Sequence, residues 1–224
     1  MDLSPLWISL KIAVIATIIT FVLGILIARL VSKMKKGKAI VDSILSIPLV
    51  LPPTVVGFFL LVIFGSNSPI GKVLDKIGAN VIFTVTGAVI AAVIVSFPIM
   101  YRSTRGALEQ VDQTYVDAAR TLGMGEWTIF GKVIMPNAWP GIAAATVLTF
   151  ARALGEFGAT IMVAGNIPGK TRTMSVAIYS FMQSGNRDKA YLWVGIVIAF
   201  SLVILIAMNL FTGSFKRRKR WSYK

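Results

Sequence analysis

Five long apolar segments dominate this sequence. They cover residues 6–31, 40–64, 80–101, 137–164 and 190–211. A helix needs about 20 mostly apolar residues to cross the hydrocarbon core of a bilayer, and each segment is long enough. Inside lipid the backbone polar groups must be paired within the chain, so such segments form helices. The sequence therefore predicts an all-α membrane protein with five transmembrane helices in one domain, residues 1–224.

The composition excludes most catalytic and metal-binding chemistry. Only 14% of residues are charged, and the mean hydropathy is +0.78, whereas soluble domains carry about 25% charged residues. The chain has no cysteine, no histidine and nine acidic residues, so it lacks thiolate ligands and the usual near-neutral general base. We expect no metal site, no catalytic residues and no enzyme activity of its own.

The distribution of basic residues predicts the orientation in the membrane. Fifteen Lys and Arg flank the apolar segments on one side, including the clusters 33–38 and 216–220, against seven on the other side. Short cytoplasmic loops are enriched in Lys and Arg. This pattern predicts the N-terminus outside, the C-terminus inside and basic clusters that contact anionic lipid. The net charge of +14 is thereby explained without nucleic-acid binding.

The polar stretch 114–136 has strong helix signals. Thr114 and Asp117 have the spacing of a capping box, and an apolar face follows at i, i+3, i+4 and i+7: Tyr115, Ala118, Ala119 and Leu122. Gly123 stands where a left-handed cap ends a helix. A second short helix would place Trp127, Phe130 and Ile134 on one face, and Pro136 suits the first turn of the next span. Such a loop either lies on lipid headgroups or presents a surface to a soluble partner.

This loop resembles the EAA motif of binding-protein-dependent ABC transporter permeases: Glu-Ala-Ala, three residues, Gly, nine residues, Ile-x-Leu-Pro. The matching positions are Asp117, Ala118, Ala119, Gly123, Val133, Met135 and Pro136. The spacing is intact, with Asp for Glu, Val for Ile and Met for Leu. The resemblance implies a MetI-like ABC permease core whose loop is a cytoplasmic coupling helix docked on an ATPase. The implied coupling residues are Asp117, Ala118, Ala119, Leu122, Gly123, Trp127 and Pro136.

Three further segments, 45–65, 150–160 and 166–173, resemble the molybdate branch of that family. The resemblance implies a permease subunit of the cell membrane that imports molybdate or tungstate by alternating access. It also implies a homodimer, two cytosolic ATPase subunits that bind ATP and Mg²⁺, an extracytoplasmic molybdate-binding protein and no cofactor on this chain. Sulfate and thiosulfate permeases share the FARALGEFGA-type segment but are usually longer, and they remain the alternative. A standalone secondary transporter or channel is the alternative from another class, although no internal repeat favours it.

Prolines in the second apolar segment point to a translocation path. Pro48, Pro52 and Pro53 remove backbone hydrogen bonds, and helix breaks at membrane depth survive where protein or a water-filled cavity satisfies the backbone. The hydroxyls of Ser46 and Thr54 lie nearby in sequence and could meet an oxyanion. The alternative is a simple kink in a packed helix.

Arg152 and Glu156 lie four residues apart in the fourth segment. Charges inside a membrane are costly and often functional. An internal i, i+4 ion pair that joins helices is the simpler interpretation, and we favour it.

The segment 164–171 satisfies a relaxed P-loop pattern. A working P-loop follows a buried strand and opens a helix, whereas this one follows a transmembrane segment on the expected outer side. We expect Asn166, Lys170 and Arg172 to face the binding protein instead, the alternative being a solvated loop.

Overall fold

The computed structural model describes the backbone of residues 2–221 and the side chains of residues 2–207. Within this part every regular element is helical. The elements are α1 (Ser4–Ser32), α2 (Lys38–Val50), α3 (Pro53–Phe64), α4 (Pro69–Lys76), α5 (Val85–Glu109), α6 (Gln113–Thr121), α7 (Glu126–Ile129), the π-helical turn η1 (Phe130–Ile134), α8 (Met135–Leu154), α9 (Gly158–Ala164), α10 (Met174–Gln183) and α11 (Arg187–Trp221). The predicted all-α membrane fold is confirmed.

Among the described residues, four continuous helices are long and apolar enough to span a membrane, and a fifth span exists there only as a bent pair. The expected helix over 40–64 is therefore wrong as a single rod: α2 and α3 meet at 104°. Leu51 is extended, with φ −67° and ψ 139°, because the residue before a proline is displaced from the helical region. Pro52 and Pro53 together cause the break, whereas Pro48 is accommodated inside α2.

The fourth expected span, 137–164, is also divided. It ends as α8 at Leu154, and α9 starts at Gly158 after Phe157, whose φ of −130° and ψ of −57° interrupt the helix. Toward its N-terminal end the same span is longer than expected, since one continuous helix runs over Glu126–Leu154. Pro136 therefore lies inside this helix. It has no N–H to donate to Lys132, and the wider turn η1 immediately precedes it.

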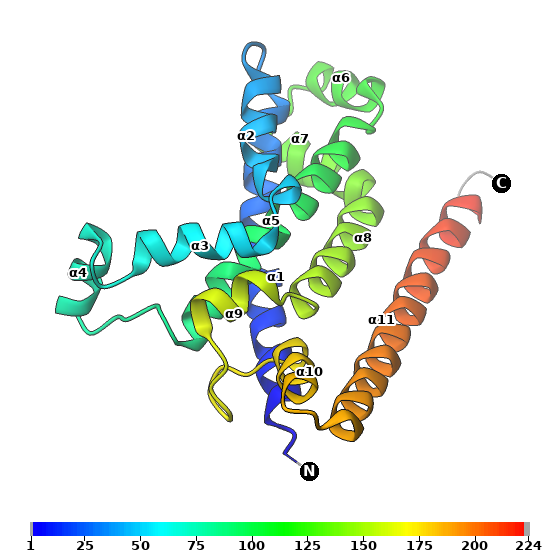
Figure 1. Ribbon diagram of the computed structural model, residues 1–224. Helices are drawn as coiled ribbons and strands as arrows, with labels where there is room; N and C mark the ends of the chain where they lie inside the picture. The colour runs from blue at the N-terminus through cyan, green and yellow to red at the C-terminus, as the bar shows by residue number, and fades with distance from the viewer. Residues whose placement is uncertain (1, 222–224) are drawn as a thin grey trace.

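The centre of the bundle is built from close helix contacts. α1 packs along α5, and α5 packs along α8 (Figure 1). The contact uses small side chains that are fully buried, Ala13 and Ala16 on α1 and Ala88 and Ala92 on α5. In membranes helix pairs associate through such small residues, because they let the backbones approach.

The two ends of the bundle differ. Figure 1 shows the N-terminus at one end, together with α10 and the α9–α10 loop. The opposite end carries α6, α7, the start of α2 and the last turns of α11. The loop and the last turns of α11 thus lie at the same end of the bundle. Which side of the membrane this end faces stays a prediction from charge. The basic cluster 216–220 falls on helix α11, outside the residues whose side chains are described, and Lys224 lies beyond the described backbone.

Candidate coupling loop and membrane site

The first loop helix begins two residues earlier than the sequence suggested. Asp112, not Thr114, is the N-cap of α6: its carboxylate accepts the backbone N–H of Thr114 at 2.9 Å. This bond lowers the pKa of the Asp112 carboxyl, because the charged form is the better acceptor. At the other end Gly123 has φ +74°, the left-handed conformation expected of the residue that terminates a helix.

A small core of its own holds the loop together. Val116, Ala119 and Ile129 are buried against one another, with Met124 and Val133 beside them. Ala119 therefore faces inward and is not part of an exposed contact surface.

The outer face of the loop consists of Tyr115, Ala118 and Leu122. All three are exposed, Leu122 to 81%. Of the face expected from periodicity, these three residues lie on the outer surface of the loop. Their role in coupling stays a prediction.

Arg29 connects the loop to the end of α1. Only 6% of this residue is exposed, and its guanidinium lies 3.5 Å from the ring centroid of Trp127 and 3.9 Å from that of Phe130. Its Nη2 also approaches the carbonyl of Glu126 at 3.4 Å. Cation–π contacts are strongest when the cation is desolvated, so this arrangement anchors the second loop helix. From its position in the sequence, Arg29 is only one of the fifteen basic residues that indicate topology, since nothing nearby indicates two distant aromatic partners.

Glu126 joins the loop to α1 by charge. Its carboxylate pairs with Lys33 at 3.3 Å and with Arg120 at 2.9 Å, and Arg120 also reaches Asp117 at 3.1 Å. The carboxylate of Glu126 raises the pKa of Arg120. These pairs are half-exposed, so each contributes little on its own, but together they orient α6 relative to α7. Asp117 is used here as an internal partner.

Two of the four residues predicted for a translocation path, Pro53 and Thr54, lie where the two helix breaks meet. A Cβ atom at Gly158, the first residue of α9, would come within 3.0 Å of Pro53 Cβ and 3.1 Å of the Thr54 backbone N. A second close contact joins the same helices, where a Cβ on Gly57 of α3 would lie 2.9 Å from Ala159 Cα of α9. Hence α3 and α9 pack backbone to backbone. Pro52 and Thr54 are exposed and Ser46 is buried, so the structure brings Pro53 and Thr54 to the second break while Ser46 lies on α2.

The intramembrane charge pair is part of the second break. Arg152 Nη1 lies 2.7 Å from Glu156 Oε2, and Glu156 Oε1 accepts the backbone N–H of Ala159 at 2.8 Å. Glu156 is only 3% exposed. The carboxylate thus caps the first turn of α9 while Arg152 neutralises it. This geometry supports the structural interpretation of the pair.

The loop between α9 and α10 lies at the N-terminal end of the bundle (Figure 1). Arg172 Nε donates to Asn166 Oδ1 at 2.6 Å, and Lys170 is exposed. Ser9 of α1 anchors the loop where it joins α10: its hydroxyl accepts the N–H of Met174 at 2.8 Å. The relaxed P-loop pattern thus lies between two helices in an all-helical region, without the strand that a phosphate-binding loop requires.

Among the described residues no three Asp or Glu side chains gather into a potential metal site. The fold and the loop instead define a class: a transport permease with broken membrane helices and a helical loop at one end.

The comparisons with known proteins agree with this class. Residues 20–220 match the family described as the inner membrane component of binding-protein-dependent transport systems. The chain belongs to this family, and the resemblance found in the sequence is confirmed. It is thus a multi-pass protein of the inner membrane.

The chain is similar to two known permeases in sequence and to one solved structure in fold. The chain is 46% identical over 202 residues to the molybdenum transport system permease protein ModB of Escherichia coli, covering 88% of each chain. It is 34% identical over 212 residues to the E. coli sulfate transport system permease protein CysT, covering 94% of this chain and 76% of that one. An inward-facing structure of the MetNI methionine ABC transporter aligns with a TM-score of 0.72 over 94% of both chains, at 17% identity, which shows a shared fold.

Proposed function

We propose that this chain is the membrane-spanning subunit of an ATP-driven importer for molybdate or tungstate. The observation that carries the proposal is the 46% identity to the molybdenum permease over 88% of both chains. The sulfate permease is less similar, and this chain covers only 76% of it. A sulfate or thiosulfate importer remains the second candidate, because that relative still aligns with 94% of this chain.

In the proposed complex two copies of the chain enclose the path at a two-fold axis, the commonest symmetry of oligomers. Two cytosolic ATPase subunits bind the ATP and Mg²⁺, and this chain holds no cofactor. A molybdate-binding protein docks on the outer side against Asn166, Lys170 and Arg172. This orientation follows from the excess of Lys and Arg at the end of the bundle that carries the loop.

The loop couples ATP binding to movement of the helices. Its outer face, Tyr115, Ala118 and Leu122, offers small and apolar groups that allow close approach by an ATPase. Gly123 and the Arg29 contacts fix the direction in which the loop projects. When the ATPase subunits close, the loop moves with α7, and the continuous helix Glu126–Leu154 carries that displacement to the break beside Glu156. The chain itself performs no chemistry, so its contribution is rigid transmission and a path for the anion.

The test is uptake of labelled molybdate by cells that lack this gene and carry either the wild-type gene or Gly123→Pro. We expect uptake with the wild type only, and excess sulfate should not reduce it. Normal uptake by Gly123→Pro would contradict the coupling role of the loop. If cells that lack this gene lose sulfate uptake but take up molybdate normally, the sulfate candidate would be favoured. Purification of the chain without any ATPase subunit would favour a channel or secondary transporter.

A further inference from the structure

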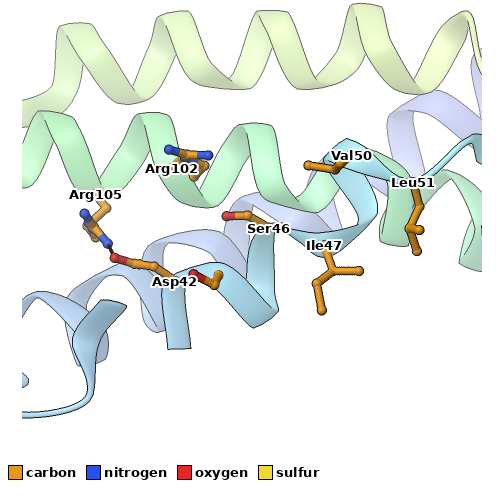
Figure 2. Close-up of a pocket in the computed structure, with 8 residues that line it drawn as sticks. Asp42, Ser46, Ile47, Val50, Leu51, Arg102 and Arg105 are labelled. Carbon is orange, nitrogen blue, oxygen red and sulfur yellow. Dashed lines mark ion pairs between the residues drawn. The ribbon is translucent and has the colours of Figure 1, made fainter. Parts of the chain in front are cut away.

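A pocket of about 490 Å³ lies between α2 and α5. It is separate from the loop contacts and from the contact between α3 and α9. Its lining, drawn in Figure 2, consists of Asp42, Ser43, Ser46, Ile47, Val50, Leu51, Arg102 and Arg105. One end of the pocket lies beside the ion pairs near the start of α2 and the end of α5. The other end reaches Leu51, the residue that precedes the break.

The charges in this pocket are unequally satisfied. Arg105 pairs with Asp42 across the two helices, as the dashed line in Figure 2 shows, and also with Glu109 at 3.3 Å. Asp42 additionally accepts the hydroxyl of Tyr101. Arg102, by contrast, makes no hydrogen bond or ion pair with any residue in the described part of the chain. The lining therefore has two cations and one anion, and Arg102 is the cation without an anionic partner.

A polar group on the α2 side of the pocket is buried and unsatisfied, whereas Arg102 is exposed to solvent. Ser46 is 8% exposed, and its Oγ is buried without a hydrogen-bond partner among the described residues. Ser43, one turn earlier, already donates to the carbonyl of Ala39 at 2.8 Å. A buried hydroxyl without a hydrogen-bond partner is destabilising, because it has lost its bonds to water. An acceptor oxygen placed between α2 and α5 would satisfy Ser46 and neutralise Arg102 together.

We propose that this pocket binds a tetrahedral oxyanion, with Arg102 supplying an opposite charge and Ser46 Oγ a hydrogen bond. The source of the anion rests on the proposed function: it is the transported molybdate, held between the helix break and the coupling end of the bundle. Asp42 offsets Arg105 and keeps the total positive charge small, so the anion is held weakly and is released. The phosphate group of a phospholipid has the same chemistry, and the experiment separates the two sources.

The experiment uses the purified complex of this chain with its ATPase, without binding protein, in nanodiscs of phosphatidylcholine. Equilibrium dialysis measures binding of labelled molybdate to the wild type, Arg102→Gln, Arg102→Lys and Ser46→Ala. Lys36→Gln serves as the control, since Lys36 is an exposed cation of the α1–α2 turn with no role in the pocket. A second arm uses native mass spectrometry to count phosphatidylglycerol retained by the same variants. Gel filtration checks folding.

We expect Arg102→Gln to weaken a saturable class of molybdate sites by about tenfold or more, because it removes a charge-assisted hydrogen bond. Ser46→Ala should weaken the site less, Arg102→Lys should restore part of the affinity, and Lys36→Gln should match the wild type. The wild type could instead bind no molybdate but retain lipid, and Arg102→Gln could lose that lipid. This result would support the oxyanion site and assign it to lipid phosphate. Equal molybdate binding and equal lipid retention in wild type and Arg102→Gln would overturn the proposal. If wild-type cells also fail to take up molybdate, the proposed function fails; if uptake is normal, only the pocket assignment does.

Discussion

The guanidinium of Arg29 lies 3.5 Å from the ring centroid of Trp127, although 97 residues separate Arg29 from the neighbouring Glu126 whose carbonyl it also approaches. This contact fixes the coupling loop to the first membrane helix. If the loop moves, we expect its displacement to reach α1 as well as the helix Glu126–Leu154.

Arg29→Met should uncouple transport from ATP hydrolysis. The substitution keeps an apolar side chain but removes the cation between two rings, a contact worth about 2 kcal/mol when desolvated. We expect fewer molybdate ions transported per ATP hydrolysed in proteoliposomes, with basal hydrolysis retained. Arg29→Lys should recover part of the ratio. Lys33→Met is the control, since its exposed ion pair contributes at most about 1 kcal/mol. An unchanged ratio in Arg29→Met would show that the stack does not transmit movement.

Ala118→Trp and Ala119→Trp distinguish docking from folding. Ala118 is exposed and Ala119 is buried against Ile129. We expect Ala118→Trp to prevent co-purification of the ATPase while the thermal unfolding of the permease stays unchanged. Ala119→Trp should also lower the stability, since overpacking a small core costs about 1–3 kcal/mol. Normal ATPase binding by Ala118→Trp would remove the outer face of the loop from the docking site.

Substitution of Arg152 should lower the thermal stability more than substitution of Glu156. Arg152→Met leaves a carboxylate that is 3% exposed without its counter-ion, which costs about 3 kcal/mol or more. Glu156→Gln leaves Arg152, whose side chain is 31% exposed, and its amide oxygen still accepts the N–H of Ala159. We expect the thermal midpoint to fall more in Arg152→Met than in Glu156→Gln.

The double variant Arg152→Met with Glu156→Gln should approach wild-type stability and retain molybdate uptake. Complete loss of uptake by a stable double variant would instead assign the pair a transport function.

Gly57→Ala should disrupt the contact between the broken helices. Its Cβ would lie 2.7 Å from Met162 Cβ and 2.9 Å from Ala159 Cα, so α3 and α9 must separate. We expect a lower unfolding midpoint and reduced uptake. Gly106→Ala in α5 is the matched control, because its Cβ meets nothing within 4 Å and alanine favours a helix by about 0.5–1 kcal/mol. Equal midpoints for the two variants would contradict close packing at Gly57.

Periodicity and proline positions predicted much of the loop and of the first break, because these signals are local. Gly123 was expected to end a helix and has the left-handed φ that this requires. The cap at Asp112 was missed because Thr114 also offers a capping pattern, and the geometry of the preceding turn decides between them. The second break near Glu156 carries no proline, and its local signal is weaker: Gly155 follows the last residue of α8 and Gly158 begins α9.

The sequence by itself determined that this chain is a helical membrane protein of the binding-protein-dependent permease family, since apolar length, charge distribution and motif spacing are properties of the linear chain. The tertiary structure decided which side of the loop is exposed, which groups the buried Glu156 contacts, and which residue anchors the loop. Each of these depends on contacts between segments far apart in the sequence. Arg29 meets Trp127, and Pro53 meets Gly158, only after the helices have packed.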